Sequence, residues 1–279
     1  MSTTPALARK HRKPAAAKAA RPEDDPRKHG EDQAFAAARV SFAEPRDLAE
    51  LPENEAVPVA LVVAGYALGP AAPGGPSPHA HLIIDNEPAR TVSSDGPLTL
   101  SGLARGPHLL RAVLCRPWHE VVKAPGSFAL VRFWIGPKLE GKSGKAAEYV
   151  AWPDAKKPLL TYVLPIGAPG KDAPDLVLER ADGSASDEGT GGASDELAAA
   201  AERPILDFYL SQARLARRGD KVRVVLDRRE LPLVTEWKPQ RLRRARPGPH
   251  KLTIDLLNRR GLKVKNAVNR SDRSFVARE

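Results

Sequence analysis

Residues 106–114 read GPHLLRAVL, and residues 248–256, which lie 142 positions later, read GPHKLTIDL. In both copies a Gly-Pro pair, typical of a tight turn, opens an apolar segment of the kind that forms a buried strand. At the same offset, residues 81–136 align without a gap with residues 223–278 and share 12 identities in 56 positions. The shared residues include Asp85 and Asp227, each at the end of the preceding strand segment. This pattern predicts a duplicated domain.

Further strand segments surround the first copy of the repeat. They read VPVALVVAGYAL at 57–68, HLIID at 81–85, PLTL at 97–100 and SFALVRFWI at 127–135. Gly, Pro and Asp separate them at short intervals, which indicates antiparallel sandwiches rather than βαβ units. We therefore predict an all-β protein with two tandem immunoglobulin-like antiparallel β-sandwich domains and a disordered N-terminal tail.

Composition sets the expected boundaries. Residues 1–54 form a basic tail of Ala, Pro and Lys that lacks apolar anchors and is expected to be disordered. The first sandwich is expected over 55–138, a linker over 139–156, and the second sandwich over 157–279. A low-complexity acidic insert at about 171–202 is expected to be flexible.

Several short motifs carry a resemblance to a known group of proteins. They are RPWHE at 116–120, GSFA at 126–129, LLTY at 159–162, LDFYL at 206–210, WKP at 237–239 and NAVN at 266–269. Together they resemble an uncharacterised bacterial family, of cyanobacterial type, with tandem immunoglobulin-like and fibronectin-III-like domains. The resemblance covers roughly residues 80–276 and implies the sandwich fold, but no activity. The chain departs from the family in its acidic linker 181–196 and its Arg-rich strand 241–246.

Charge is unevenly distributed along the chain. The net charge is +10 overall, +13 over residues 203–279 and −8 over residues 172–202. Basic surfaces attract nucleic acid, anionic lipid or acidic protein, although a solvated surface is the simpler interpretation. The single cysteine, Cys115, lies in an apolar run and is expected to be a buried small hydrophobe.

No targeting or membrane segment is expected. The first thirty residues lack the apolar core of a secretory signal, and the most apolar stretch, 57–68, is too short to span a bilayer. We therefore expect a cytoplasmic protein by default. The alternative is the cell envelope, if the start codon is misassigned.

One literal nucleotide-binding motif is present. Gly136, Gly141, Lys142 and Ser143 satisfy the spacing of a phosphate-binding loop. Pro137 removes a backbone N–H from the would-be cradle, no long amphipathic helix is expected after the motif, and the preceding strand is expected to end a sandwich. We therefore do not predict nucleotide binding at these residues.

Four histidines are candidates for metal ligands or for structural residues. His79 and His81 would share one face of a strand, with Asp85 nearby, but no third clustered ligand is expected. We therefore predict no metal and no cofactor. His108 and His250 occupy equivalent positions of the repeat, and we expect each to hydrogen-bond nearby backbone.

The candidate ligand-binding residues are Arg116, Trp118 and His119. An exposed Trp beside Arg and His could stack on a sugar or anchor a peptide, whereas the simpler interpretation is a Trp that covers the open end of the sandwich. His119 and Glu120 would face opposite ways in a strand, and no Ser or Cys has the surroundings of a catalytic nucleophile. We therefore do not expect an enzyme.

The densest basic run contains Arg241, Arg243, Arg244 and Arg246. It could contact a polyanion together with Arg217, Arg218, Arg228, Arg229, Arg259 and Arg260. No aromatic platform interleaves these arginines, so the simpler interpretation is an edge strand protected by charge.

The sequence favours a non-enzymatic binding or scaffolding protein. Its sandwich loops or edge strands would hold a protein or glycan whose identity is unknown. The alternative is a basic accessory protein that binds nucleic acid, or another polyanion, through the N-terminal tail and the Arg-rich second domain.

Overall fold

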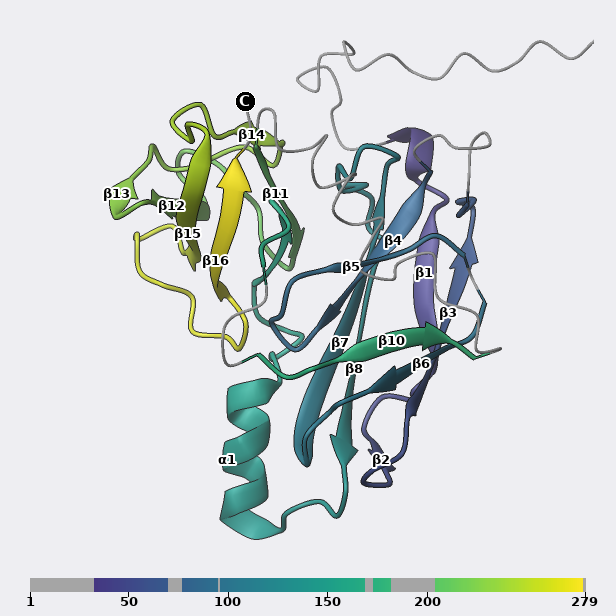
Figure 1. Ribbon diagram of the computed structural model, residues 1–279. Helices are drawn as coiled ribbons and strands as arrows, with labels where there is room; N and C mark the ends of the chain where they lie inside the picture. The colour runs from purple at the N-terminus through teal and green to yellow at the C-terminus, as the bar shows by residue number, and fades with distance from the viewer. Residues whose placement is uncertain (1–32, 70–76, 95, 169–172, 182–203, 278–279) are drawn as a thin grey trace, which may run out of the picture.

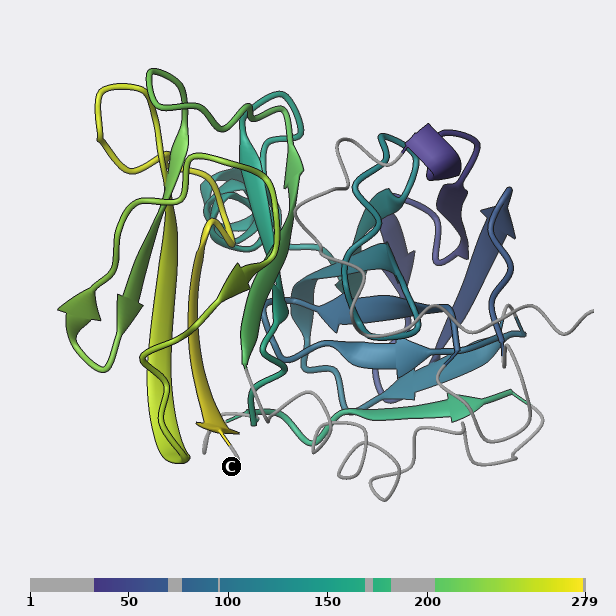
Figure 2. The ribbon, with the colours of Figure 1, turned by 90° about the horizontal axis from the view of Figure 1, so that it is seen from above.

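The computed structural model describes residues 33–69, 77–94, 96–168, 173–181 and 204–277. These residues form two β-sandwiches that lie side by side, with α1 (Gly141–Ala151) against the first (Figures 1 and 2). The predicted all-β class is confirmed. Residues 1–32 of the predicted disordered tail 1–54, and most of the acidic insert, lie outside the described residues.

The first sandwich contains sheets of order β1-β3-β6-β10 and β2-β8-β7-β4-β5. Neighbouring strands pair antiparallel except β2, which runs parallel to β8. The adjacency of β4, β7 and β8 opposite β1, β3 and β6 is typical of an immunoglobulin-like sandwich. The bounds are β1 (Arg39–Glu44), β2 (Ala49–Leu51), β3 (Val57–Ala64), β4 (His79–Ile84), β5 (Arg90–Val92), β6 (Leu98–Ser101), β7 (Gly106–Cys115), β8 (Phe128–Ile135) and β10 (Val177–Arg180).

The second sandwich repeats this plan with sheets of order β14-β11-β9 and β13-β12-β15-β16. Strands β12, β15 and β16 lie 142 residues after β4, β7 and β8 at both ends, which is the offset of the sequence repeat. The bounds are β9 (Leu159–Leu164), β11 (Ile205–Ser211), β12 (Lys221–Leu226), β13 (Arg229–Glu230), β14 (Gln240–Arg241), β15 (Gly248–Leu257) and β16 (Arg270–Ala277).

Burial along the strands follows from what covers each face. In β16 buried and exposed residues alternate, because only one face of that strand packs on the core. In β4 every residue is buried, because its outer face is covered by the second sandwich at Ile83 and by the loop that carries His119 at His81. Each sandwich has its own apolar core, and a third cluster fills the contact between them. That cluster consists of Ile83, Val113, Cys115, Val121, Val163, Leu164 and Tyr209.

The expected boundary at residue 54 is too late. Strands β1 and β2 belong to the first sandwich, and Gln33–Phe35 form a short 3₁₀ turn before them. Val40 and Phe42 point into the first core from β1 at the two-residue period of a strand. The Ala-rich and charged surroundings hide this short pattern in the sequence.

The expected boundaries of the linker and of the acidic insert also differ from the structure. Residues 141–151 of the linker form α1. Within the insert, β10 pairs with β6 of the first sandwich, and Leu178 enters the first core. The chain therefore returns to the first sandwich after β9 has begun the second.

The residues shared by the two repeats build the same turn. His108 Nδ1 lies 3.0 Å from Asp85 Oδ2, and its Nε2 lies 2.7 Å from the carbonyl oxygen of Ala104. His250 makes the same pair of contacts, both 2.6 Å long, with Asp227 Oδ2 and the carbonyl oxygen of Arg246. The predicted backbone contacts of both histidines are confirmed, and the carboxylate contacts were not predicted.

These contacts require charged imidazole rings. A carbonyl and a carboxylate oxygen both accept hydrogen bonds, so both ring nitrogens of His108 donate. Burial alone would lower the pKa of His108, but the hydrogen bond and charge of Asp85 outweigh it and the pKa is raised. The pKa of His250 is raised likewise: burial opposes the shift, and the Arg246 carbonyl and Asp227 outweigh it.

We expect Asp85→Asn to destabilise the protein in a pH-dependent way. Asn tolerates the left-handed backbone of residue 85, whose φ is 52°, and can still accept the Leu109 N–H, so the variant removes mainly the charge. The stability contributed by a raised His pKa is complete below the unfolded value of 6.5 and is lost as the pH rises through the folded pKa. The cost, about 1–3 kcal/mol at about pH 6, should therefore shrink as the pH rises above 6.5 through the raised pKa of His108. Urea unfolding at several pH values measures it, and a cost that does not change with pH would contradict the charged pair.

Candidate functional site

The loop of residues 116–120 continues the hairpin of β7 and β8. The Arg116 N–H donates to the Glu120 carbonyl at 2.8 Å, and the His119 N–H donates to the Arg116 carbonyl at 2.9 Å. Cys115 and Val121 pair across its base. The loop is therefore a closed turn whose ends are held together by backbone hydrogen bonds.

The three predicted ligand-binding residues lie in this loop, but they differ in exposure. Arg116 and His119 are buried, whereas Trp118 is 45% exposed. The Arg116 guanidinium lies between the rings of Phe35 and Trp118, 4.8 Å and 5.6 Å from their centroids. Trp118 Nε1 donates to Glu120 Oε2 at 2.9 Å. Of the three, only Trp118 presents a large exposed surface.

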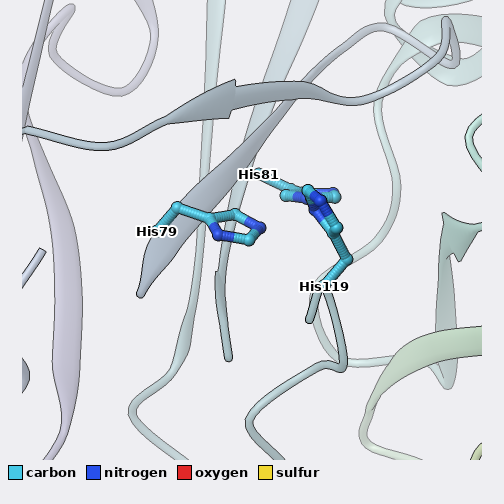
Figure 3. Close-up of side chains that lie close together, drawn as sticks. All are labelled: His79, His81 and His119. Carbon is cyan, nitrogen blue, oxygen red and sulfur yellow. The ribbon is translucent and has the colours of Figure 1, made fainter. Parts of the chain in front are cut away.

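His119 turns away from solvent and completes a cluster with His79 and His81 (Figure 3). His79 and His81 share the outer face of β4, and their rings stack with centroids 4.8 Å apart. His81 Nε2 lies 3.0 Å from His119 Nδ1. One ring nitrogen of each histidine lies within 4.8 Å of the other two. The expectation that His79 and His81 have no third clustered partner is therefore wrong.

Burial lowers the pKa of His79 and His81, whereas the pKa values of His108 and His250 in the repeat are raised. Burial, with the charge of His119, lowers the pKa of His79 to about 3, and burial lowers the pKa of His81 well below 6.5. His79 and His81 are therefore neutral at pH 7. His79 Nδ1 lies 2.8 Å from the Ser77 carbonyl oxygen and must donate to it, which leaves the lone pair on Nε2. Neutral imidazole is the form that coordinates metal ions.

Asp85, the acidic residue that the sequence placed near this pair, does not join the cluster. Its carboxylate is held by His108 and by the Leu109 N–H. Cys115 is buried as predicted, and burial raises the pKa of its thiol well above the ordinary value. Among the described residues, the candidate ligands are therefore the three imidazoles alone.

The second sandwich anchors the segment that follows the loop. Asp207 of β11 accepts the Val121 N–H at 2.8 Å and lies 2.9 Å from Lys123 Nζ, with both side chains buried. Tyr209 O–H donates to the Ala124 carbonyl at 2.9 Å. Burial raises the pKa of Asp207, and the Lys123 charge opposes that rise. The path of the chain after residue 120 is thus fixed by contacts across the two sandwiches.

A second polar contact lies further along the same boundary. The buried guanidinium of Arg111 donates to the Asp85 carbonyl at 2.6 Å and to Thr161 Oγ1 at 3.3 Å. Arg273 donates to the Asn86 carbonyl at 2.6 Å. Burial, together with the charge of Arg273, lowers the pKa of Arg111 to about 9. The two sandwiches therefore form one body through hydrogen bonds as well as apolar packing.

The phosphate-loop residues lie beside a helix that was not expected. Gly141, Lys142 and Ser143 open α1, which follows β8. However, β8 pairs antiparallel with β7 along its whole length and parallel with the three-residue strand β2, whereas a phosphate loop follows a strand of a parallel sheet. A Cβ placed on Gly144 would lie 1.8 Å from the Leu139 carbonyl oxygen, so the loop packs against the first turn of the helix. The helix was not expected after the motif, whereas the position of β8 in the sheet of the first sandwich is as the sequence predicted.

The helix instead covers the outer face of the first sandwich. Glu148 forms an ion pair with Lys138 at 2.7 Å and accepts a hydrogen bond from Trp134 Nε1 at 3.2 Å. Trp152, which ends the helix, donates through Nε1 to the His108 carbonyl at 2.9 Å. These contacts give α1 a structural role.

The arginines proposed as one patch fall into two groups. Arg241, Arg243, Arg244 and Arg246 are exposed just before β15 begins. At the other end of β15, on the order of 30 Å away at about 3.4 Å per residue, an open cleft of about 730 Å³ is lined by Arg214, Arg218, Arg259 and Arg260. The cleft also includes Asp220 and Asn258. The sequence analysis named three of these arginines, Arg218, Arg259 and Arg260, but not their separation from the Arg-rich run.

Comparisons with known proteins find distant matches among solved structures. No protein-family model and no curated protein matches the chain. A structure of the fibronectin(III)-like modules of Clostridium thermocellum CbhA is 10% identical with a TM-score of 0.25, covering 86% of this chain and 94% of that chain. The mixed-linkage glucan utilization protein SGBP-B of Bacteroides ovatus, solved with a mixed-linkage heptasaccharide, is 13% identical with a TM-score of 0.22, covering 85% and 70%. The fold assignment therefore rests on the strand pairing described above. No family model matches the chain, so the resemblance to the bacterial family has no support from this comparison.

We expect Asp207→Asn to destabilise the protein by about 3–5 kcal/mol, because it leaves the Lys123 ammonium buried without its counter-charge. Urea unfolding at neutral pH measures the loss. Glu236→Gln is the matched control, because Glu236 and Lys238 form an exposed pair at 3.0 Å whose removal should cost less than about 1 kcal/mol. Equal effects of the two variants would show that the buried pair does not hold the sandwiches together.

Proposed function

We propose that the chain is a non-enzymatic binding or scaffolding protein that holds a protein or glycan partner at the loop of residues 116–120. The observation that carries this proposal is the exposed indole of Trp118. Its ring is 45% exposed although its N–H is bonded to Glu120 and the Arg116 guanidinium lies beside it. An aromatic ring in this setting offers a large apolar face with polar groups at its edge, a combination that is common at binding hot spots.

The rigidity of the loop supports the same proposal. Arg116 and His119 of the same loop are buried, and Asp207 holds the chain that follows. A side chain that is already fixed loses less conformational entropy when a partner docks on it. Trp118 is not among the residues that pack on the apolar core of the first sandwich.

A second candidate function is supported by the arginine-lined cleft. Four guanidinium groups line one cleft at the end of the second sandwich, and such groups bind phosphate and sulfate oxygens through several hydrogen bonds at once. The partner would be nucleic acid or another polyanion. The N-terminal tail, the other element of this alternative, lies outside the described residues.

No helix among the described residues is long and apolar enough to cross a membrane. This finding bears on neither candidate function, since both need only a surface that a partner can reach.

We expect Trp118→Ala to weaken partner binding roughly 30-fold or more, which corresponds to a hot-spot loss of about 2 kcal/mol. The full chain would be tested on immobilised polysaccharides of glucose, N-acetylglucosamine and mannose, and in parallel in a pull-down from cell extract. Tyr149→Ala is the control, because Tyr149 is an exposed aromatic on α1, outside the loop. Partners that bind Trp118→Ala as tightly as the unaltered chain would overturn the proposal, whereas retention on a polysaccharide would identify the partner as a glycan.

We expect Arg259→Ala combined with Arg260→Ala to lower the salt dependence of polyanion binding. Each lost phosphate contact reduces the slope of log K against log salt by about 0.9 on duplex DNA, so the slope should fall by about 2. A gel-shift titration with a short DNA duplex measures this. The control combines Arg243→Ala with Arg244→Ala, at the opposite end of β15. It should leave the slope of log K against log salt unchanged, because these residues lie outside the cleft. The absence of any shift at about 50 mM salt would exclude this second function.

A further inference from the structure

The histidine cluster has the dimensions of a metal site. Nitrogen ligands lie about 2.0–2.1 Å from a zinc ion, so two ligands of a tetrahedral site lie about 3.3 Å apart. His81 Nε2 and His119 Nδ1 are 3.0 Å apart, and all three histidines offer a ring nitrogen within 4.8 Å of the others. Small rotations about the side-chain bonds would bring the third nitrogen to coordination distance.

The hydrogen bonding of the cluster is incomplete. His79 Nε2 and His81 Nδ1 are buried and have no hydrogen-bond partner. Buried polar atoms normally have partners, so such atoms require an explanation. His79 Nε2 carries a lone pair, because Nδ1 donates to Ser77, and Figure 3 shows its ring directed toward His81 and His119. A cation among the three rings would satisfy this lone pair.

The contact between His81 and His119 fits the same explanation. Two ring nitrogens that face each other at 3.0 Å share a single hydrogen when both rings are neutral. A metal ion between the two nitrogens accepts a lone pair from each ring, and the hydrogen that they shared moves to the other nitrogen of the ring that carried it, so both imidazoles stay neutral. The bond from His79 Nδ1 to the Ser77 carbonyl is the supporting contact that usually orients a metal-binding imidazole.

We propose that His79, His81 and His119 bind one divalent transition-metal ion of the zinc class. Three imidazoles suit Zn²⁺, Co²⁺, Ni²⁺ or Cu²⁺, whereas Ca²⁺ and Mg²⁺ require oxygen ligands. Because three protein ligands leave a tetrahedral ion one position short, the fourth position belongs to water or to a small donor. This inference does not depend on the proposed partner-binding function.

The bound ion would join two parts of the first sandwich. His79 and His81 belong to β4, and His119 belongs to the loop that carries Trp118. Residue 119 also has a left-handed backbone, with φ of 64°, which a coordinated side chain would help to hold. Metal binding therefore fixes the loop 116–120 to the sheet beneath it.

The test uses the full chain after treatment with a chelator, with Co²⁺ as the probe. We expect one equivalent of Co²⁺ to bind, with visible absorption bands of a four- or five-coordinate ion that Zn²⁺ abolishes by displacement. His79→Gln and His119→Gln should each weaken Co²⁺ binding more than about 100-fold, since even loss of a supporting residue costs up to that amount. His250→Gln is the matched control, because it removes a histidine outside the cluster, and it should bind one equivalent as before.

Two further measurements keep the proposal falsifiable if a variant fails to fold. X-ray absorption of the unaltered chain with one equivalent of Zn²⁺ should show three imidazole ligands. Zn²⁺ should also raise the thermal midpoint of the unaltered chain, because a ligand that binds only the folded state stabilises it. The proposal is wrong if Co²⁺ binding survives in the combined His79→Gln and His119→Gln variant, if fewer than three imidazoles surround Zn²⁺, or if the unaltered chain binds no Co²⁺.

Discussion

The buried ion pair between Lys123 and Asp207 joins the two sandwiches a few residues after the loop that carries Trp118 and His119. Asp207 also holds the Val121 N–H, so one carboxylate fixes both a charge and a backbone group of the neighbouring sandwich. A buried charge without a partner costs several kcal/mol. Arrangements of the two sandwiches that pair Lys123 with Asp207 are therefore favoured over arrangements that leave either charge buried alone. The loop is thus positioned by the second sandwich as well as by its own hairpin. Both its exposed indole and its buried imidazole depend on that support.

Much of the fold could be predicted because the duplicated residues are also the residues that build it. His108 and His250 recur at the start of equivalent strands because each closes a turn through a carboxylate and a carbonyl. Strands β1 and β10 were missed because they are short, and β10 pairs with a strand almost eighty residues earlier. Helix α1 was missed because glycines at its start weaken the local helical signal, whereas Trp134 and Trp152 stabilise it through tertiary contacts.

The candidate site could be predicted only in part, because it depends on contacts between residues that are far apart in the sequence. The two-residue spacing of His79 and His81 predicts a shared face, and the structure has it. His119 is 38 residues after His81. It reaches this face because β7 pairs with β4, so that the loop after Cys115 begins opposite His79. The low pKa of His79 depends on burial, which no local pattern encodes. The exposure of Trp118 likewise depends on how the loop turns, not on the residue type.

The return of β10 to the first sandwich has a consequence for how the protein is made and inherited. The chain crosses between the sandwiches three times, before β9, before β10 and before β11. During synthesis, β9 has therefore left the ribosome before the first sandwich can be completed, and it waits unpaired for β11. A gene segment that ends just before β9 would lack β10, and the remaining segment would encode the second sandwich with β10 of the first inserted in it. The two sandwiches share a repeated sequence pattern, yet neither is encoded by one uninterrupted stretch of the chain.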